Sequence, residues 1–336
     1  MRANNDLGYG SDMKVVLHLG AHKTASTYLQ ARLGNSTNVL AGRQIMYIGP
    51  EAVREALSRA GSLQFAGKAI AFQTRRRLVR AMEKLVHDAA CAGANRVIIS
   101  DETLLGRLSE IHENGHLFEH VRRRLRVFQD SFGDVDLKIL LAVRGFDGFL
   151  PSVWSHMVLR RGYTPFDMGR ARGMIDARRR WSDVVKDVAK TYPNAHLTVW
   201  RYEDMKAVET RVLRAFADDY GVSAIEPIKW RALSGLSATA VEALEKLRTE
   251  GTPTGPEQVR KLWRQYPKPK GHAAFQPFGN DMLDRLRADY AQDLERIAAM
   301  EQVTVLAPDD QFGKNVRKNA EASQPAASAT RIDTIP

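Results

Sequence analysis

The sequence predicts an α/β protein in which a parallel sheet is covered by helices on both faces and is followed by a helical C-terminal part. Two observations support this prediction. Short runs of β-branched and other apolar residues recur between residues 14 and 201 and have the length of buried strands. Longer segments with helical periodicity separate these runs, and such alternation is typical of βαβ units.

Five strands are predicted in the first two thirds of the chain. They are KVVLHLG (14–20), QIMYIG (44–49), NRVIIS (95–100), DLKILLAV (136–143) and HLTVWR (196–201). Helices are expected from about residue 26 and over 51–93, 149–161, 176–191 and 281–300. Beyond residue 202 the pattern is mostly helical, with breaks at Pro227, 251–256 and 266–279, where proline and glycine gather.

The length and composition favour one large domain. The 336 residues are 44% hydrophobic, and no internal repeat or long linker divides them. We expect a flexible N-terminus over 1–12, an α/β domain over 13–305 and a disordered tail over 306–336, which is rich in Ser, Ala, Gln and Pro.

The net charge indicates an anionic partner. Lys and Arg exceed Asp and Glu by 50 − 39 = 11, so the surface should attract a nucleotide, an acidic glycan or an anionic membrane. Nucleic acid is not expected, because no aromatic residues alternate with the arginine runs and no zinc-finger or RRM signature is present. The sequence shows neither a signal peptide nor a long apolar run, which predicts a cytoplasmic protein whose membrane contact, if any, is peripheral.

The segment HLGAHKTASTYL, residues 18–29, carries the main chemical signal. A strand, a polar turn and a helix start follow one another, and this geometry surrounds a phosphate with backbone N–H groups. Lys23 adds a positive charge, and the hydroxyls of Thr24, Ser26 and Thr27 add donors. The segment is not a Walker A loop, because His22 stands where that motif needs glycine. A helix capped by Ser or Thr after a strand is the non-functional alternative.

The register K-T-A-S-T-Y-L at 23–29 resembles the 5′-phosphosulfate loop, roughly K-S/T-G-T-T-W-L, of sulfotransferases that use PAPS (3′-phosphoadenosine 5′-phosphosulfate). The resemblance implies a P-loop-type sheet, PAPS as donor and PAP as product. Ala25 replaces the usual glycine, and Tyr28 stands at the aromatic that stacks on adenine in cytosolic members. The implied donor-binding residues of this loop are His22, Lys23, Thr24, Ala25, Ser26, Thr27 and Tyr28.

A second match lies downstream. VRGFDGFLPSVW, residues 143–154, resembles the family's 3′-phosphate segment, in which an arginine and a serine stand eight residues apart, as Arg144 and Ser152 do here. Asp147 also matches, whereas Phe146 replaces the usual proline. An arginine at the carboxyl end of a strand can present its donor fork to a phosphate. Alternatively, Arg144 pairs with Asp147 in a surface turn.

A third match is RYEDMK, residues 201–206, which resembles the Y-E-D-L/M segment of the cytosolic members and implies that Tyr202 approaches adenine. Glu203 and Asp204 are better explained as acids at the start of the next helix. The family's R-K-G segment is absent in that form. Lys268, Lys270 and Gly271 form the nearest basic loop and are candidate ligands.

For the chemistry, Lys23 is expected to stabilise the charge that develops on the leaving phosphate. The resemblance implies a base just after the strand 95–100, where Asp101 and Glu102 stand. Asp101 could instead cap a short helix and leave Glu102 free. His22 and His156 are the alternative bases. No metal-binding motif is present in the sequence.

The expected function is therefore transfer of a sulfuryl group from PAPS to an acceptor hydroxyl, on a carbohydrate or glycolipid, with a carboxylate as general base. Two alternatives remain at this point. One is a P-loop kinase or NTPase that uses ATP and Mg²⁺, and the other is a nucleotide- or glycan-binding protein without turnover.

Overall fold

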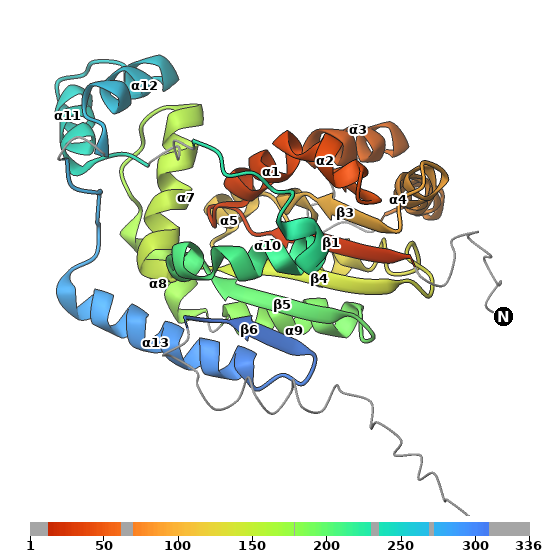
Figure 1. Cartoon of the computed structure of the whole chain (residues 1–336). Helices are drawn as coiled ribbons and strands as arrows, with labels where there is room; N and C mark the ends of the chain where they lie inside the picture. Colours follow the sequence, from red (N-terminus) through yellow and green to blue (C-terminus); the bar gives the residue numbers. More distant parts are fainter. Residues whose placement is uncertain (1–12, 62–69, 178, 230–234, 269–271, 309–336) are drawn as a thin grey trace, which may run out of the picture.

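The structure is a computed structural model that describes residues 13–61, 70–177, 179–229, 235–268 and 272–308 (Figure 1). The strands are β1 (Lys14–Gly20), β2 (Ile45–Ile48), β3 (Arg96–Ser100), β4 (Asp136–Val143), β5 (His196–Arg201) and β6 (Val303–Leu306). The α-helices are α1 (Ser26–Asn35), α2 (Thr37–Ala41), α3 (Pro50–Ala60), α4 (Phe72–Cys91), α5 (Leu108–Asn114), α6 (Val121–Leu125), α7 (Phe146–Arg161), α8 (Met168–Asp176), α9 (Trp181–Thr191), α10 (Met205–Val222), α11 (Ala238–Thr249), α12 (Pro256–Gln265) and α13 (Asn280–Ala298). Two short 3-10 helices, η1 (Glu102–Leu104) and η2 (Tyr202–Asp204), follow β3 and β5.

The six strands form one parallel sheet in the order β2-β3-β1-β4-β5-β6. β1 therefore lies between β3 and β4. The chain first adds β2 and β3 on one side of β1 and then crosses to add β4, β5 and β6 on the other side. In open α/β sheets ligands bind beyond the carboxyl ends of the strands at such a switch point. The fold thus places the segment after Gly20 where a ligand is expected.

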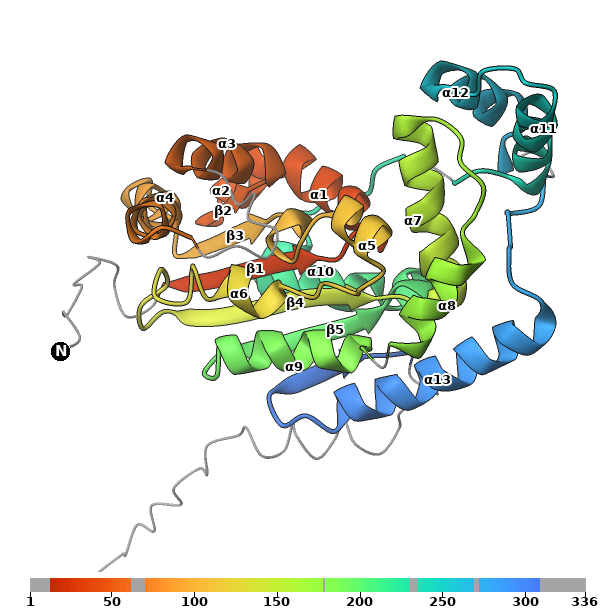
Figure 2. The same ribbon diagram turned by 180° about the vertical axis from the view of Figure 1, so that it is seen from behind.

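Alternating side chains of the strands enter two separate cores. In β1, Val15, Leu17 and Leu19 join the core that α3, α4, α6, α9 and α13 cover, whereas Val16 joins the core under α1, α2 and α10. Figure 1 looks onto the α10 face, and Figure 2 looks onto the α9 face. Burial on both faces explains why the strands read as continuous apolar runs.

The C-terminal helices α11 and α12 pack against the far part of α7 and project from the sheet, as Figures 1 and 2 both show. Their core contains Trp154, Leu236, Leu244 and Leu262. A second contact joins α7 to the segment before α13. Pro151 lacks an N–H, so the carbonyl of Asp147 loses its helical partner, and the side chain of Gln276 donates to it at 3.3 Å.

The predicted fold class is confirmed, and the five predicted strands are present. The structure adds β6, whose last residue, Leu306, lies one position beyond the expected domain end at 305. Two predicted helices are divided: the segment 51–93 contains α3 and α4, and 176–191 contains the end of α8 and all of α9. The expected N-terminal segment 1–12 and residues 309–336 of the expected tail 306–336 lie outside the described residues.

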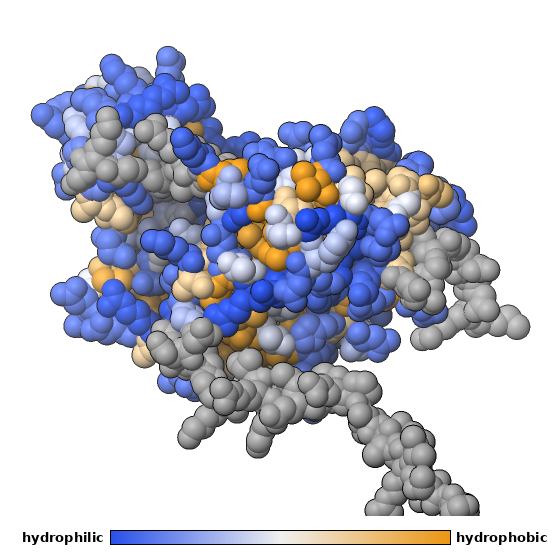
Figure 3. Space-filling view, in the orientation of Figure 1, coloured by the Kyte–Doolittle hydropathy of each residue, from blue (hydrophilic) through white to orange (hydrophobic). Residues whose placement is uncertain are grey.

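The surface of the described chain is largely hydrophilic. Figure 3 shows this on one face, where apolar residues form small areas between polar ones. No described helix combines the length and the apolar character that crossing a bilayer requires.

Candidate functional site

The loop after β1 has an unusual backbone. Ala21, Lys23 and Ala25 all have positive φ, between 64° and 66°, and residues of negative φ separate them. Left-handed conformations are unfavourable for residues with a Cβ atom and cost about 1–3 kcal/mol each, so the surrounding structure must hold them. Backbone turns in which the φ sign alternates form concave arrays of N–H groups that bind anions. The loop geometry therefore fits a phosphate or sulfate group.

Two hydroxyls hold this loop in place. Thr24 Oγ1 donates to the carbonyls of Ala21 (2.7 Å) and Gly20 (3.2 Å), and Ser26 Oγ donates to that of Ala21 (2.8 Å). Both side chains are buried, whereas Thr27 is exposed. We expected all three hydroxyls to face the ligand. Instead, the hydroxyls of Thr24 and Ser26 bond to backbone carbonyls of the loop and so stabilise its strained backbone.

Helix α1 starts directly at this loop without a capping side chain. Its N-cap residue is Ala25, which offers no side-chain acceptor to the first N–H groups of the helix. In the described part of the chain, the backbone N–H groups of residues 22–25 also donate to no backbone carbonyl. These donors are available to an anion, and the helix dipole favours negative charge at the same point.

Arg144 connects the end of β4 to the loop. Its guanidinium Nη1 donates to the carbonyl of Lys23 at 2.7 Å, and its Cζ lies 4.2 Å from the centre of the Tyr202 ring. Gly148 provides the space for this arrangement, because a Cβ there would lie 3.2 Å from Nε and Nη2 of Arg144. The second and third sequence matches thus meet the first at one edge of the sheet.

Three cations gather at this edge. Burial and, to a lesser extent, the nearby charges of Arg144 and Lys268 together lower the pKa of Lys23 from 10.5 to about 8. Burial and Arg144 likewise lower the pKa of Lys268. Among the described residues, none of these three forms an ion pair with a carboxylate within 4.0 Å. An anion placed between them would relieve their mutual repulsion. Lys270 and Gly271, the other candidates in that segment, lie outside the described residues.

The remaining candidates of the donor site are distributed around this cluster. Ser152 lies partly buried in α7, two turns beyond Arg144. Tyr28 is partly buried against α10, where its hydroxyl donates to Glu209. Oδ2 of Asp147 lies 3.9 Å from Nε of Arg287, and Asp147 forms no ion pair with Arg144. The alternative in which Arg144 pairs with Asp147 in a surface turn therefore does not describe this structure.

The acids after Tyr202 have structural partners. Glu203 accepts a hydrogen bond of 3.0 Å from the backbone N–H of Gly145 and one of 3.2 Å from the hydroxyl of Tyr290. Asp204 is the N-cap residue of α10. The position of Asp204 agrees with our interpretation of it as a helix-start residue, whereas Glu203 bonds to the start of α7 and not to the helix that follows it.

Asp101 is fully buried and committed to local bonds. Its carboxylate accepts from the N–H (2.9 Å) and the hydroxyl (2.8 Å) of Thr103, and so caps η1. Arg54 of α3 donates to the same carboxylate at 2.8 and 3.1 Å. The capping alternative for Asp101 is therefore realised, and its side chain has no exposed surface from which to reach an acceptor.

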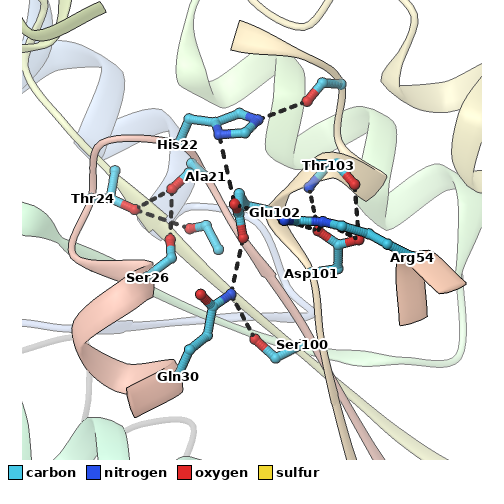
Figure 4. A network of polar contacts seen from close by, with 12 residues as sticks. Ala21, His22, Thr24, Ser26, Gln30, Arg54, Ser100, Asp101, Glu102 and Thr103 are labelled. Carbon is cyan, nitrogen blue, oxygen red and sulfur yellow. Dashed lines mark hydrogen bonds and ion pairs between the residues drawn. The ribbon is translucent and has the colours of Figure 1, made fainter. Parts of the chain in front are cut away.

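Glu102 lies beside the loop. A Cβ at Gly20, which has φ +70°, would come within 3.0 Å of the Cβ of Glu102. Figure 4 shows the Glu102 carboxylate between His22, Gln30 and Arg54. Gln30 donates to Oε2 at 2.9 Å and Arg54 donates to Oε1 at 2.9 Å. Burial alone raises the pKa of Glu102, but His22, Gln30 and Arg54 together outweigh burial and bring the pKa below its usual value. Glu102 is therefore ionised at neutral pH.

The two candidate histidines both lie near Lys23. His22 Nε2 is 3.0 Å from the carbonyl of Gly106, and its ring stacks on Phe118 with centroids 6.5 Å apart. Burial lowers the pKa of His156 to about 4, and the charge of Lys23 acts in the same direction. Burial also lowers the pKa of His22.

Sequence reasoning missed Arg54 and Gln30. Both belong to helices that the sequence predicts, but nothing in their local patterns marks them as site residues. The two residues come close to Glu102 only in the folded protein, where α3 and α1 meet the end of β3.

A hollow of about 640 Å³ lies at the opposite edge of the sheet and is lined by Lys14, Arg96, Asp218 and Tyr220. There Asp218 pairs with Arg96.

No family model, no curated protein and no solved structure matches this chain.

Proposed function

We propose that the protein is a sulfotransferase that moves a sulfuryl group from PAPS to an acceptor hydroxyl. One observation carries the proposal: a strained loop with available N–H groups lies beside three mutually repelling cations and next to the ionised Glu102. The cations suit a donor that bears phosphate at two positions, and the carboxylate suits a base for a hydroxyl. The resemblance of three ordered segments to the PAPS-dependent family supports the same assignment.

The proposed roles follow from where charge moves. As the acceptor oxygen attacks sulfur in line, negative charge builds on the bridging oxygen and the leaving phosphate. Lys23 and the N–H groups of residues 22–25 stabilise that charge, because fixed donors in a poorly solvated site act most strongly where charge develops. Arg144 and Lys268 hold the 3′-phosphate end of the donor. Glu102 accepts the proton of the acceptor.

The acceptor is proposed to be a carbohydrate or glycolipid hydroxyl. Glu102, Gln30 and Arg54 form a polar wall beside the loop, and such a combination of acceptors and donors fits a polyhydroxylated substrate. We propose cytoplasmic residence together with this function.

The proposal is tested by assaying sulfate transfer from labelled PAPS to a panel of glycans and phenols, with and without EDTA. We expect transfer to at least one glycan and the same rate with EDTA. Binding of PAP without transfer to any acceptor would favour a binding protein, and would contradict the enzymatic assignment.

A second candidate, a P-loop kinase or NTPase, is favoured by one observation. Asp101 follows β3 directly beside the loop, where an NTPase places an acid that contacts Mg²⁺ through water. A cation there would compete with Arg54, which already engages both Asp101 and Glu102. ATP hydrolysis that EDTA abolishes, without transfer from PAPS, would select this candidate.

A further inference from the structure

The tautomer of His22 is fixed by its surroundings. Its Nε2 lies 3.0 Å from the carbonyl oxygen of Gly106, and a carbonyl can only accept, so Nε2 carries the hydrogen. In the neutral ring, Nδ1 then has a lone pair. The Nδ1 atom that carries this lone pair lies 4.0 Å from Oε1 of Glu102. His22 therefore turns a basic nitrogen toward Glu102 (Figure 4).

Glu102 cannot rotate freely away from His22. Gln30 holds Oε2 and Arg54 holds Oε1, at 2.9 Å each. The imidazole is also fixed, because Phe118 stacks on its ring with an interplanar angle of 14°. Two fixed proton-accepting atoms thus face each other, and a proton that Glu102 takes up has the lone pair of Nδ1 within reach through one water molecule or a small closure.

We propose that His22 is the proton-accepting partner of Glu102. This inference rests on the proposed function. The O–H bond of the acceptor breaks, and its electron pair forms the new bond to sulfur. The bond between sulfur and the bridging oxygen breaks, and its electrons remain on the leaving nucleotide. The proton goes to Glu102 and then to Nδ1 of His22, and the imidazolium, whose side chain is 15% exposed, returns it to solvent.

The charged groups around His22 both raise and lower its pKa. Glu102 and Asp101 favour the imidazolium, whereas Arg54 opposes it. His156 and Lys23 also lie close by, and His22 contributes to the lowered pKa of His156. Burial lowers the pKa of His22 overall, so the ring is neutral at pH 7 and its Nδ1 carries no proton.

The first experiment measures the ring of His22 by nitrogen NMR in the wild type and in Glu102→Gln, without any substrate. We expect the Nε2–H tautomer in the wild type and a lower His22 pKa in Glu102→Gln, because a negative neighbour is lost. His116→Gln, a change at an exposed histidine, serves as the control and should leave the His22 pKa as it is. An unchanged His22 pKa in Glu102→Gln would overturn the inference, whether or not the protein transfers sulfate.

The second experiment compares kcat and PAP affinity in His22→Gln, Glu102→Gln and the double variant. Gln at position 22 can still donate to Gly106 but cannot take a proton. We expect each single variant to lose about 10²-fold or more in kcat and to keep the PAP affinity of the wild type. The kcat of the double variant should be no lower than that of the less active single variant, because the two groups act as one unit. Multiplicative losses, or a normal kcat in His22→Gln, would refute the pair. Absence of transfer by a wild type whose His22 does respond to Glu102 would refute the proposed function, and with it the relay.

Discussion

The guanidinium of Arg144 donates a 2.7 Å hydrogen bond to the carbonyl of Lys23. This bond joins the end of β4 to the loop after β1. Both residues bring a positive charge to the same place, and the bond fixes how far apart the loop and the arginine lie. The bond therefore restricts the loop and the arginine to one relative position, and such restriction reduces the entropy that ligand binding must overcome.

Lys23→Ala should weaken PAP binding and lower turnover. A charge-assisted contact contributes roughly 1.5–3 kcal/mol, which corresponds to about 10- to 150-fold. Calorimetry with PAP and the transfer assay measure the two effects. Lys186→Ala removes the same charge from the exposed surface of α9 and is the control. Wild-type affinity and turnover in Lys23→Ala would remove the basis for the loop assignment.

Arg144→Ala should reduce the preference for PAP over AMP, which lacks the 3′-phosphate. The wild type is expected to bind PAP more tightly, and the variant should lose much of that difference. Arg144→Lys keeps the charge but not the planar fork that bonds to the Lys23 carbonyl, so it should restore the preference only in part. Equal affinity of the wild type for PAP and AMP would contradict the role of Arg144.

Donor affinity should depend on pH through Lys23. Its pKa is lowered to about 8 in the free protein, so the ammonium is charged below that pH and loses its charge as pH rises through it. A bound phosphate favours the charged form and raises the pKa, so binding near pH 8–9 should take up a proton. Calorimetry between pH 6.5 and 9.5 should show full affinity at the acidic end and weaker binding at the alkaline end. Lys23→Arg, which stays charged, should show no such decline; a decline of the same size in Lys23→Arg would assign it to another group.

Glu102 and Asp101 should respond differently to loss of charge. Glu102→Gln should fold and bind PAP normally but lose about 10²–10⁴ in turnover, because Gln cannot accept the proton. Asp101→Asn should have a much milder effect on turnover but should lower the thermal stability, because the buried carboxylate bonds to Thr103 and Arg54. Such a loss costs roughly 1–3 kcal/mol. If Asp101→Asn lost most of the turnover and Glu102→Gln lost mainly stability, Asp101 would be the base and Glu102 the structural residue.

Ala25→Gly should leave PAP binding intact and should not destabilise the protein. Ala25 has φ +66°, where glycine relieves strain, and this relief of about 1–2 kcal/mol offsets the extra entropy of glycine in the unfolded chain. Ala291→Gly in the exposed interior of α13 is the control and should cost about 1 kcal/mol. Equal destabilisation of both variants in thermal unfolding would show that the loop conformation of Ala25 is not strained.

The sheet could be predicted from the sequence because its strands are buried on both faces. β1, β3 and β4 are continuous apolar runs, and helical segments of sufficient length separate them. β6 was not predicted, because its four residues, VTVL, lie between a long helix and the polar C-terminal segment, and no further helical pattern follows them in the sequence to indicate another βαβ unit. The sequence pattern could not predict the strand order either, because the order depends on how the connections cross the sheet.

The site could be predicted only where its residues lie in the segments that follow strands. Lys23, Arg144 and Glu102 each come soon after a strand and meet because parallel strands end at one edge. The sequence did not reveal that the hydroxyls of Thr24 and Ser26 bond to carbonyls of the loop itself, because the positive φ values of the loop are not visible in the residue types. Arg54 and Gln30 come from helix interiors and reach Glu102 only through tertiary packing.

The contact between Gln276 and the carbonyl that Pro151 leaves open has a consequence for the cation cluster. Lys23 and Arg144 are attached to the sheet, whereas Lys268 belongs to the connection between α12 and α13. Gln276 anchors the end of that connection to the first turn of α7, next to Arg144. Donor binding by all three cations therefore requires the sheet and the α11–α12 part to keep the arrangement that this contact supports, so a change in how α12 packs on α7 would alter donor affinity without any change in the loop after β1.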